Sequence, residues 1–338
     1  MTASIQCKAI MLNEIKPYGN LSGLSLEYIE VPSPSENEVR LKVEAFSLNY
    51  GDFELFAGAY TFGLTLPARI GGECSGVVEA VGSGVTKWKI GDKVCTLPSF
   101  YDGYGVNGEF ALFPADYLSP YPDTLKPEEA CCIWVAHLTA YYAMNDIAKI
   151  KPDDWVLITA ASSSAGMAAM EHCKMIGAKT IGTTRNSSKK QRVLDIGFDH
   201  VIAQDEGNMS GLILEYSGGV GVRVIYDPIG GKIVQNYKDG LAQNAMIILY
   251  GGMDQSPTIV PEIEMTRKAA FFHCFSTFNH IADMASLERG RRFVFDAVAE
   301  GKLTPRVESV YLLEDYKQAF ADQFSPTSRS GKMVISCA

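Results

Sequence analysis

The sequence predicts an α/β protein with a β-rich first part and a doubly wound parallel sheet in its second part. From residue 154 onward, apolar segments typical of buried strands alternate with helical patterns over short connections, as in a parallel sheet covered by helices. Before residue 125, shorter apolar or alternating stretches are separated by Gly, Pro and Asn turns. The length of 338 residues is sufficient for two domains.

The first part is expected to consist of short strands followed by helices. Four stretches share an apolar or alternating pattern and are predicted as strands: 39–45, 74–81, 93–97 and 110–113. A helix is expected to begin in the region 126–130, close to Pro122 and Pro127. A second helix is expected through 134–147, which is rich in Ala, Tyr and Leu.

The second part is expected to be the parallel sheet. Its first strand is predicted at 155–161, a continuous apolar run, and further strands are predicted at 179–184, 200–203, 222–226, 245–250 and near 270–275. Helical patterns lie between them at 165–176, 188–195, 209–217 and 231–241. A long helix is expected at about 286–300, and then three strands at 307–312, 316–323 and 332–336. These last strands are too few for a domain, so we expect them to complete the first one.

The composition excludes several classes of protein. Hydrophobic residues make up 47% and charged residues 20%, which allows a full globular core. The net charge of −9 argues against nucleic acid or an anionic membrane as the main partner. The eight cysteines form no CxxC pair, which indicates free thiols in a reducing cytosol. The N-terminus lacks the pattern of a signal peptide, and no apolar run reaches the roughly 18 residues of a membrane span. We therefore expect a cytoplasmic protein that acts on a small molecule.

A turn of small residues, Ser162 to Gly166, follows the first strand of the predicted sheet and opens a helix. The free N–H groups and the positive dipole end of such a helix favour an anion. Only Gly166 remains of the three glycines in the usual dinucleotide fingerprint. Serines can replace glycines where backbone N–H groups and hydroxyls both donate to phosphate oxygens. The alternative is an ordinary βαβ unit with a small-residue turn.

The residues after the second strand of the sheet predict which dinucleotide is bound. An acidic residue at this point binds a ribose hydroxyl, whereas an Arg accommodates a 2′-phosphate. This chain has Arg185 here, with Lys189 and Lys190 shortly after it. The sequence therefore predicts a site that prefers NADPH. The alternative for Arg185 is a solvated surface charge.

Several ordered motifs carry a resemblance to a known family. They are SLNYGD at 47–52, RIGGECSGVVEAVGSGV at 69–85, KIGDKV at 89–94, VIYDPIGG at 224–231, LYGG at 249–252 and SGKMVIS at 330–336. With them the chain resembles the medium-chain dehydrogenase/reductases, specifically the zinc-independent quinone oxidoreductase and enoyl reductase branch. The resemblance implies a GroES-like β-barrel catalytic domain and a Rossmann NADPH-binding domain. The barrel domain would comprise residues 1–126 and 273–338, and the Rossmann domain residues 127–272.

Zinc-dependent members of this family hold a catalytic metal with three side chains. The resemblance aligns those ligands with Asn49, Gly72 and Val135, none of which can bind zinc here. Glu73 follows the second position, but a lone carboxylate is not a zinc site. The four clustered cysteines of the structural zinc lobe are reduced to Cys95. We therefore expect no metal.

Without a metal, a conjugated acceptor is easier to reduce than an isolated ketone, because the charge spreads into an enolate or a hydroquinone anion. The resemblance implies catalytic roles for Asn49 and Tyr60. The Asn49 amide would orient a carbonyl or the nicotinamide ribose, and the Tyr60 phenol would donate to the acceptor oxygen. The alternative for Tyr60 is an aromatic residue that only lines the site.

The resemblance also implies a set of cofactor-binding residues that would contact the nicotinamide, the pyrophosphate, the 2′-phosphate and the riboses. They are Thr139, Ser163, Ser164, Ala165, Gly166, Thr184, Arg185, Lys189, Gly251, Gly252 and Phe275. The expected activity is NADPH-dependent reduction of a quinone or an α,β-unsaturated carbonyl. The alternatives are an enoyl-thioester reductase and a catalytically silent NADPH-binding structural or regulatory protein. Relatives commonly pair through edge strands of the Rossmann sheet, which implies a homodimer.

Overall fold

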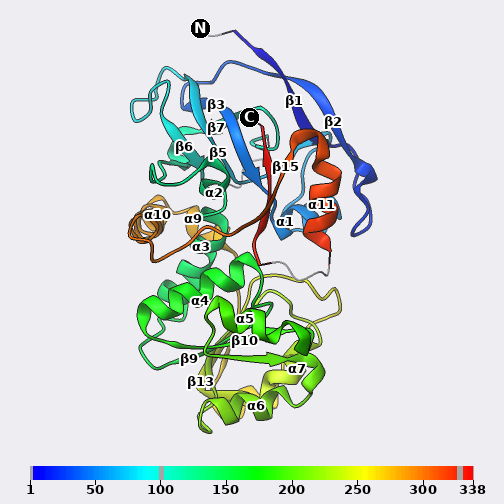
Figure 1. Ribbon diagram of the computed structural model, residues 1–338, viewed down its shortest axis with the longest axis vertical. Helices are drawn as coiled ribbons and strands as arrows, with labels where there is room; N and C mark the ends of the chain where they lie inside the picture. Colours follow the sequence, from blue (N-terminus) through cyan, green and yellow to red (C-terminus); the bar gives the residue numbers. More distant parts are fainter. Residues whose placement is uncertain (1–2, 99–102, 326–329, 338) are drawn as a thin grey trace. The chain divides into compact units, whose positions relative to one another are not determined.

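The computed structural model describes residues 3–98, 103–325 and 330–337 (Figure 1). The chain divides into two compact units. Unit 1 comprises Met1–Val135 and Thr304–Ala338, and unit 2 comprises Ala136–Leu303. Among the described residues, no helix has the length and apolar character needed to cross a membrane.

Unit 2 contains a six-stranded sheet in the order β11-β10-β9-β12-β13-β14, and every neighbouring pair is parallel. The strands are β9 (Trp155–Ile158), β10 (Lys179–Thr184), β11 (His200–Ala203), β12 (Val222–Asp227), β13 (Leu241–Leu249) and β14 (Phe271–Cys274). The chain first adds strands on one side of β9 and then, from β12, on the other. This reversal is the topological switch point of a doubly wound sheet, so the predicted fold of the second part is confirmed.

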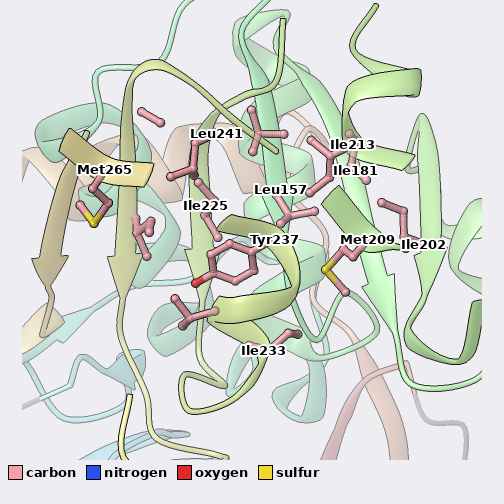
Figure 2. Packing of buried hydrophobic residues seen from close by; sticks show 14 residues of the cluster. Leu157, Ile181, Ile202, Met209, Ile213, Ile225, Ile233, Tyr237, Leu241 and Met265 are labelled. Carbon is pink, nitrogen blue, oxygen red and sulfur yellow. The ribbon is translucent and has the colours of Figure 1, made fainter. Parts of the chain in front are cut away.

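Helices lie between these strands and after the last of them. They are α4 (Ser164–Ile176), α5 (Lys190–Ile196), α6 (Met209–Tyr216), α7 (Ile233–Tyr237), α8 (Glu262–Lys268), α9 (Thr277–Ile281) and α10 (Met284–Ala299), with short 3-10 turns η4 (Ser187–Lys189), η5 (Gln204–Glu206) and η6 (Lys238–Gly240). Buried side chains from the strands and from the helices on one face form the core. Figure 2 shows the Tyr237 ring of α7 among Ile225 and Leu157 of the central strands. The strand β9 is a continuous apolar run because both faces of this central strand are covered.

The helix predicted at 134–147 changes geometry halfway. It begins as α3 (Trp134–Tyr141) and continues as a π-helix, η3 (Tyr142–Ile147), in which the Ala148 amide donates to the Ala143 carbonyl at 2.9 Å. Contacts with α10 accompany the change. The Tyr142 hydroxyl donates to the Ser286 carbonyl at 3.1 Å, and a Cβ on Gly290 would lie 2.7 Å from that hydroxyl. These contacts hold α10 in unit 2, whereas the sequence analysis expected residues from 273 onward in the catalytic domain.

Unit 1 contains two sheets, a three-stranded one in the order β2-β1-β4 and a seven-stranded one in the order β15-β16-β3-β5-β6-β8 with β7 paired on β3. The strands are β1 (Ile5–Leu12), β2 (Leu24–Val31), β3 (Glu38–Ser47), β4 (Ala68–Arg69), β5 (Cys74–Val81), β6 (Lys93–Thr96), β7 (Phe110–Pro114), β8 (Leu118–Ser119), β15 (Val307–Leu312) and β16 (Lys332–Ser336). The helices are α1 (Tyr50–Phe56), α2 (Pro127–Ala130) and α11 (Tyr316–Phe324), with 3-10 turns η1 (Leu21–Gly23), η2 (Ala115–Tyr117) and η7 (Leu313–Asp315). The red C-terminal strand in Figure 1 is β16, which pairs antiparallel with β3, so the C-terminal segment completes unit 1.

One predicted strand of unit 1 is a helix. Residues 316–323 were expected to be extended but form most of α11. Its buried positions, Tyr316, Ala319, Phe320 and Gln323, follow the spacing i, i+3, i+4, i+7, which places them on one helical face. Phe320 packs edge-on against Phe53 of α1, with ring centroids 5.6 Å apart. The prediction was wrong because the 3.6-residue period was overlooked.

A buried histidine of unit 2 predicts a pH-dependent stability. His172 of α4 is fully buried beside His137, and neither of its nitrogens has a hydrogen-bond partner among the described residues. Burial, and then His137, lower its pKa well below the usual value of 6.5. The folded state therefore resists a proton that the unfolded state accepts. The free energy of unfolding is therefore not reduced by His172 above pH 6.5. As the pH drops below 6.5, it decreases by up to about 1.4 kcal/mol per pH unit.

We expect His172→Phe to flatten this acid dependence of the free energy of unfolding, measured by urea titration between neutral and acidic pH. Exchanging the partly exposed His200 of β11 for Phe is the control and is expected to leave the dependence unchanged. A wild-type slope that survives in the His172 variant would contradict the prediction.

Candidate functional site

The carboxyl edge of the unit 2 sheet gathers most of the predicted cofactor residues. Ser163, Ser164, Ala165 and Gly166 follow β9, and Thr184, Arg185 and Lys189 end or follow β10. Gly251 and Gly252 follow β13, and Phe275 follows β14. Because the carboxyl ends of parallel strands meet at one edge, these residues share one side of the sheet. Ligands of doubly wound sheets bind at this edge, next to the switch point.

The turn between β9 and α4 is shaped to place an anion at the helix N-terminus. Ser163 caps the helix, since its Oγ accepts from the Gly166 amide at 3.0 Å. A Cβ on Gly166 would lie 2.7 Å from the Ala160 carbonyl oxygen, so the close approach of helix and turn requires glycine. The first-turn amides of Ser164 and Ala165 make no hydrogen bond within the described residues. These two amides fit the pyrophosphate of a dinucleotide. Ser163 was expected as a phosphate contact, and its oxygen lone pair here serves the cap.

The loop after β10 carries the predicted 2′-phosphate residues. Thr184 is buried at the end of the strand, Arg185 is exposed, and Lys189 closes η4. The Asp205 carboxylate holds this loop by accepting from the Ser187 amide at 2.9 Å and 3.0 Å. A guanidinium and an ammonium on an ordered loop beside the switch point fit a dianionic phosphate.

Asp227 orders the far half of this edge. It is fully buried at the end of β12 and accepts from the Thr159 hydroxyl at 2.6 Å, the Ile229 amide at 2.8 Å and the Tyr237 hydroxyl at 2.9 Å. Gly251 lies against the same loop, because a Cβ there would be 2.7 Å from the Pro228 carbonyl oxygen. Asp227 belongs to the VIYDPIGG motif at 224–231, and its role as the acceptor that orders this edge is visible only in the structure.

The remaining predicted cofactor residues lie at different depths. Phe275 is buried, and its amide donates to the Leu249 carbonyl at 2.8 Å, which ties the end of β14 to β13. Gly252 has open space where a Cβ would project. Thr139 lies on α3 rather than after a strand, and its hydroxyl accepts from the Thr277 hydroxyl of α9 at 2.7 Å.

In unit 1, the predicted catalytic residue Asn49 belongs to a buried polar network around Glu73. Glu73 is fully buried, and its Oε1 accepts from the Trp134 amide at 2.6 Å and the Val135 amide at 3.0 Å. Its Oε2 accepts from the Ser47 hydroxyl at 3.0 Å and from Asn49 Nδ2 at 3.4 Å. The N-terminus of α3 therefore stabilises the carboxylate.

The cation of this network is Lys332, which sequence analysis missed. Its Nζ forms an ion pair with Glu73 and donates to Asn49 Oδ1 at 2.9 Å. Burial opposes the ammonium form, but the charge and hydrogen bond of Glu73, together with the neighbouring Cys132 and Cys131, raise the pKa of Lys332 overall. The available signal was a lysine at the start of an otherwise apolar strand, KMVIS, whose position required a buried partner.

Two further ionisable groups lie beside Asn49. The Asp52 carboxylate accepts from the Asn49 amide at 2.8 Å, and burial raises its pKa to about 7. The Tyr60 ring packs over Gly51, where a Cβ would lie 3.1 Å from its Cε2. Burial, and then the charges of Glu54 and Asp52, raise the pKa of Tyr60, so its phenol is a hydrogen-bond donor at neutral pH. The structure thus brings Asn49 and Tyr60 to the same end of α1.

The positions aligned with metal ligands converge on this network without forming a metal site. Glu73 contacts the Asn49 side chain and the Val135 amide. Across the described parts of the chain, no group of three or more His, Cys, Asp and Glu side chains could hold a metal ion.

Comparisons with known proteins agree with this arrangement. Residues 35–123 match the alcohol dehydrogenase GroES-like domain, and residues 165–289 match the zinc-binding dehydrogenase domain. The chain is 29% identical to the 2-haloacrylate reductase of Burkholderia sp over 314 residues, which cover 90% of this chain and 93% of that protein. It is 28% identical to the mitochondrial enoyl-[acyl-carrier-protein] reductase of Xenopus tropicalis, over 93% of this chain and 92% of that protein.

A solved structure extends the likeness to three dimensions. The Escherichia coli quinone oxidoreductase complexed with NADPH matches with a TM-score of 0.85 and 26% identity, over 97% of this chain and 99% of that one. Both matched domains and these relatives agree with the motifs quoted from the sequence. The chain belongs to the medium-chain dehydrogenase/reductase family, in the branch of the quinone oxidoreductases and enoyl reductases.

Proposed function

We propose that this chain is an NADPH-dependent oxidoreductase that reduces a quinone or an α,β-unsaturated carbonyl without a metal ion. The observation that carries the cofactor assignment is the carboxyl edge of the unit 2 sheet. There the backbone amides of Ser164 and Ala165, which make no hydrogen bond within the described residues, would bind the pyrophosphate. Arg185 and Lys189 would bind the 2′-phosphate. The relatives named above support the reaction class, since one is a quinone oxidoreductase with NADPH and another a haloacrylate reductase.

When bound, NADPH supplies a hydride. The residues of unit 1 would bind and orient the acceptor. They would also donate hydrogen bonds to its oxygen as negative charge develops there. Asn49 and Tyr60 are the proposed donors, because Tyr60 stays protonated at neutral pH and both lie at one end of α1. A conjugated acceptor suits such neutral donors, since its charge is delocalised.

The test is NADPH oxidation by the purified protein with a panel of quinones, enones and enoyl thioesters, in the presence and absence of a chelator. We expect turnover with quinones or enones that the chelator leaves unchanged. Turnover restricted to enoyl thioesters would instead favour an enoyl-thioester reductase. Tight NADPH binding without turnover by any acceptor would favour a structural or regulatory protein and would contradict the proposal.

We also propose a homodimer that forms through β14, the edge strand of the unit 2 sheet. Phe271 of this strand is 57% exposed, and Ile259 and Ile263, which precede the strand in the chain, are 68% and 57% exposed. An exposed apolar edge strand is a template for pairing with a second copy.

Accordingly, we expect sedimentation to find a dimer and Phe271→Glu to convert it to a monomer, because the carboxylates would be buried in the interface. Tyr28→Glu, at an exposed aromatic of β2 in unit 1, is the control and should remain dimeric. A wild-type monomer, or a Phe271 variant that stays dimeric, would argue against pairing through β14.

A further inference from the structure

Lys332 is a buried cation whose donors are all directed to three partners. Its side chain is 1% exposed, and its ammonium contacts the Glu73 carboxylate, Asn49 Oδ1 at 2.9 Å and Ser47 Oγ at 3.3 Å. An ammonium has three N–H donors, so these contacts use all of them. Lys332 therefore has no donor left for a substrate, and any effect on a bound molecule must pass through a partner.

Both carboxylate oxygens of Glu73 likewise accept hydrogen bonds from protein groups. Oε1 accepts from two backbone amides at the start of α3, and Oε2 accepts from Ser47, Asn49 and Lys332. The carboxylate is consequently held in one position by groups from three separate segments of unit 1, at 47–49, 134–135 and 332. It cannot turn to act as a base.

Among the described side chains that contact this ion pair, Ser47 is buried and Asn49 is partly exposed. The ammonium on its Oδ1 fixes which side of the amide carries oxygen, and one N–H of Nδ2 donates to Glu73. The second N–H of Nδ2 makes no hydrogen bond within the described residues. The cation at the oxygen draws electron density away from the nitrogen, which strengthens the second N–H as a donor, and the hydrogen bond to Glu73 fixes the direction of that N–H.

We propose that Lys332 is a positioning residue that, together with Glu73, fixes and polarises Asn49 so that its second N–H binds an anionic oxygen of the acceptor. This inference rests on the proposed function and adds the kind of atom bound at Asn49, namely an enolate or phenolate oxygen. The ion pair makes Asn49 a donor only, so its carbonyl is not offered to the substrate.

A binding experiment tests this without turnover. The full-length protein loaded with NADP⁺ is titrated with 4-nitrophenol across neutral pH, because the visible band distinguishes the bound phenolate from the phenol. Wild-type protein should bind the phenolate more tightly than the phenol. Asn49→Ala should lose this preference, and so should the double variant Lys332→Met/Glu73→Gln, which keeps the net charge of the pair.

The matched control is Arg40→Met/Glu79→Gln, which removes another buried cation from the described part of unit 1. Arg40 is 1% exposed and donates to Glu79 at 2.6 Å, but it has no contact with Asn49. The control should keep the wild-type preference. The inference is overturned if wild-type protein binds phenol and phenolate equally, or if the Lys332/Glu73 double variant keeps the preference.

A kinetic cycle adds a second readout. Loss of one donor to a developing oxyanion lowers kcat by about 100-fold or more, and we expect this for Asn49→Ala. The Lys332/Glu73 double variant should lower kcat by at least about tenfold in the wild-type background and not further in the Asn49→Ala background, since its effect passes through Asn49. Equal losses in both backgrounds would overturn the inference. If no acceptor oxidises NADPH, the proposed function fails by itself, and the phenolate preference still decides the role of Lys332.

Discussion

Replacing Arg185 and Lys189 together by alanine is expected to weaken NADPH binding by more than about tenfold while NADH binding stays nearly unchanged. Charge-assisted contacts to a phosphate contribute roughly 1.5–3 kcal/mol each, and NADH lacks the 2′-phosphate that would make them. The two dissociation constants can be measured from quenching of protein fluorescence at fixed ionic strength.

Lys190→Ala is the matched control for this prediction. It removes a charge from the same loop, but the Lys190 ammonium forms an ion pair with Glu206 at 2.8 Å. Its loss should change NADPH and NADH affinities by similar small amounts. An equal loss of both cofactors in the Arg185/Lys189 variant would reject the assignment of the 2′-phosphate to these two residues.

Lys332→Met alone is expected to lower the free energy of unfolding by about 3–5 kcal/mol, because it leaves the Glu73 carboxylate buried without its cation. Adding Glu73→Gln should restore most of that loss, since the pair is then neutral on both sides. Urea titration followed by fluorescence and circular dichroism measures both variants.

The comparison of single and double variants distinguishes two causes of the lost stability. A loss caused only by missing methylene packing would persist in the double variant, whereas a loss caused by an unpaired charge would not. If the double variant is as unstable as Lys332→Met, the stability of this region does not depend on charge compensation.

The unit 2 sheet was predictable because its strands are buried on both faces. The segments predicted at 179–184 and 200–203 coincide with β10 and β11, in which every residue after the first is buried. The strand predicted at 155–161 ends earlier, at Ile158, because Ala160 adopts a φ of 49° and starts the turn. Such a conformation of a non-glycine residue depends on its surroundings and leaves no clear mark in the sequence.

Elements that depend on contacts between distant segments were predicted less well. The π-helix of Tyr142–Ile147 accompanies the contact of Tyr142 with α10, and a single local pattern does not report it. The strand expected at 316–323 is the helix α11 because one face packs against α1. The helical period of α11 becomes visible only when the whole segment is considered, because one of its buried positions is the polar Gln323.

The order of apolar runs and turns was enough to place the Ser163–Gly166 turn and Arg185 at one edge of a parallel sheet. Right-handed crossovers and parallel pairing leave few other arrangements for such a pattern. The joining of Asn49, Glu73 and Lys332 was decided only by the tertiary structure, because Lys332 is 259 residues from Glu73 and 283 from Asn49 in the chain. Their contact depends on the antiparallel register of β16 on β3 and on burial of the ion pair, and neither is a local property of the sequence.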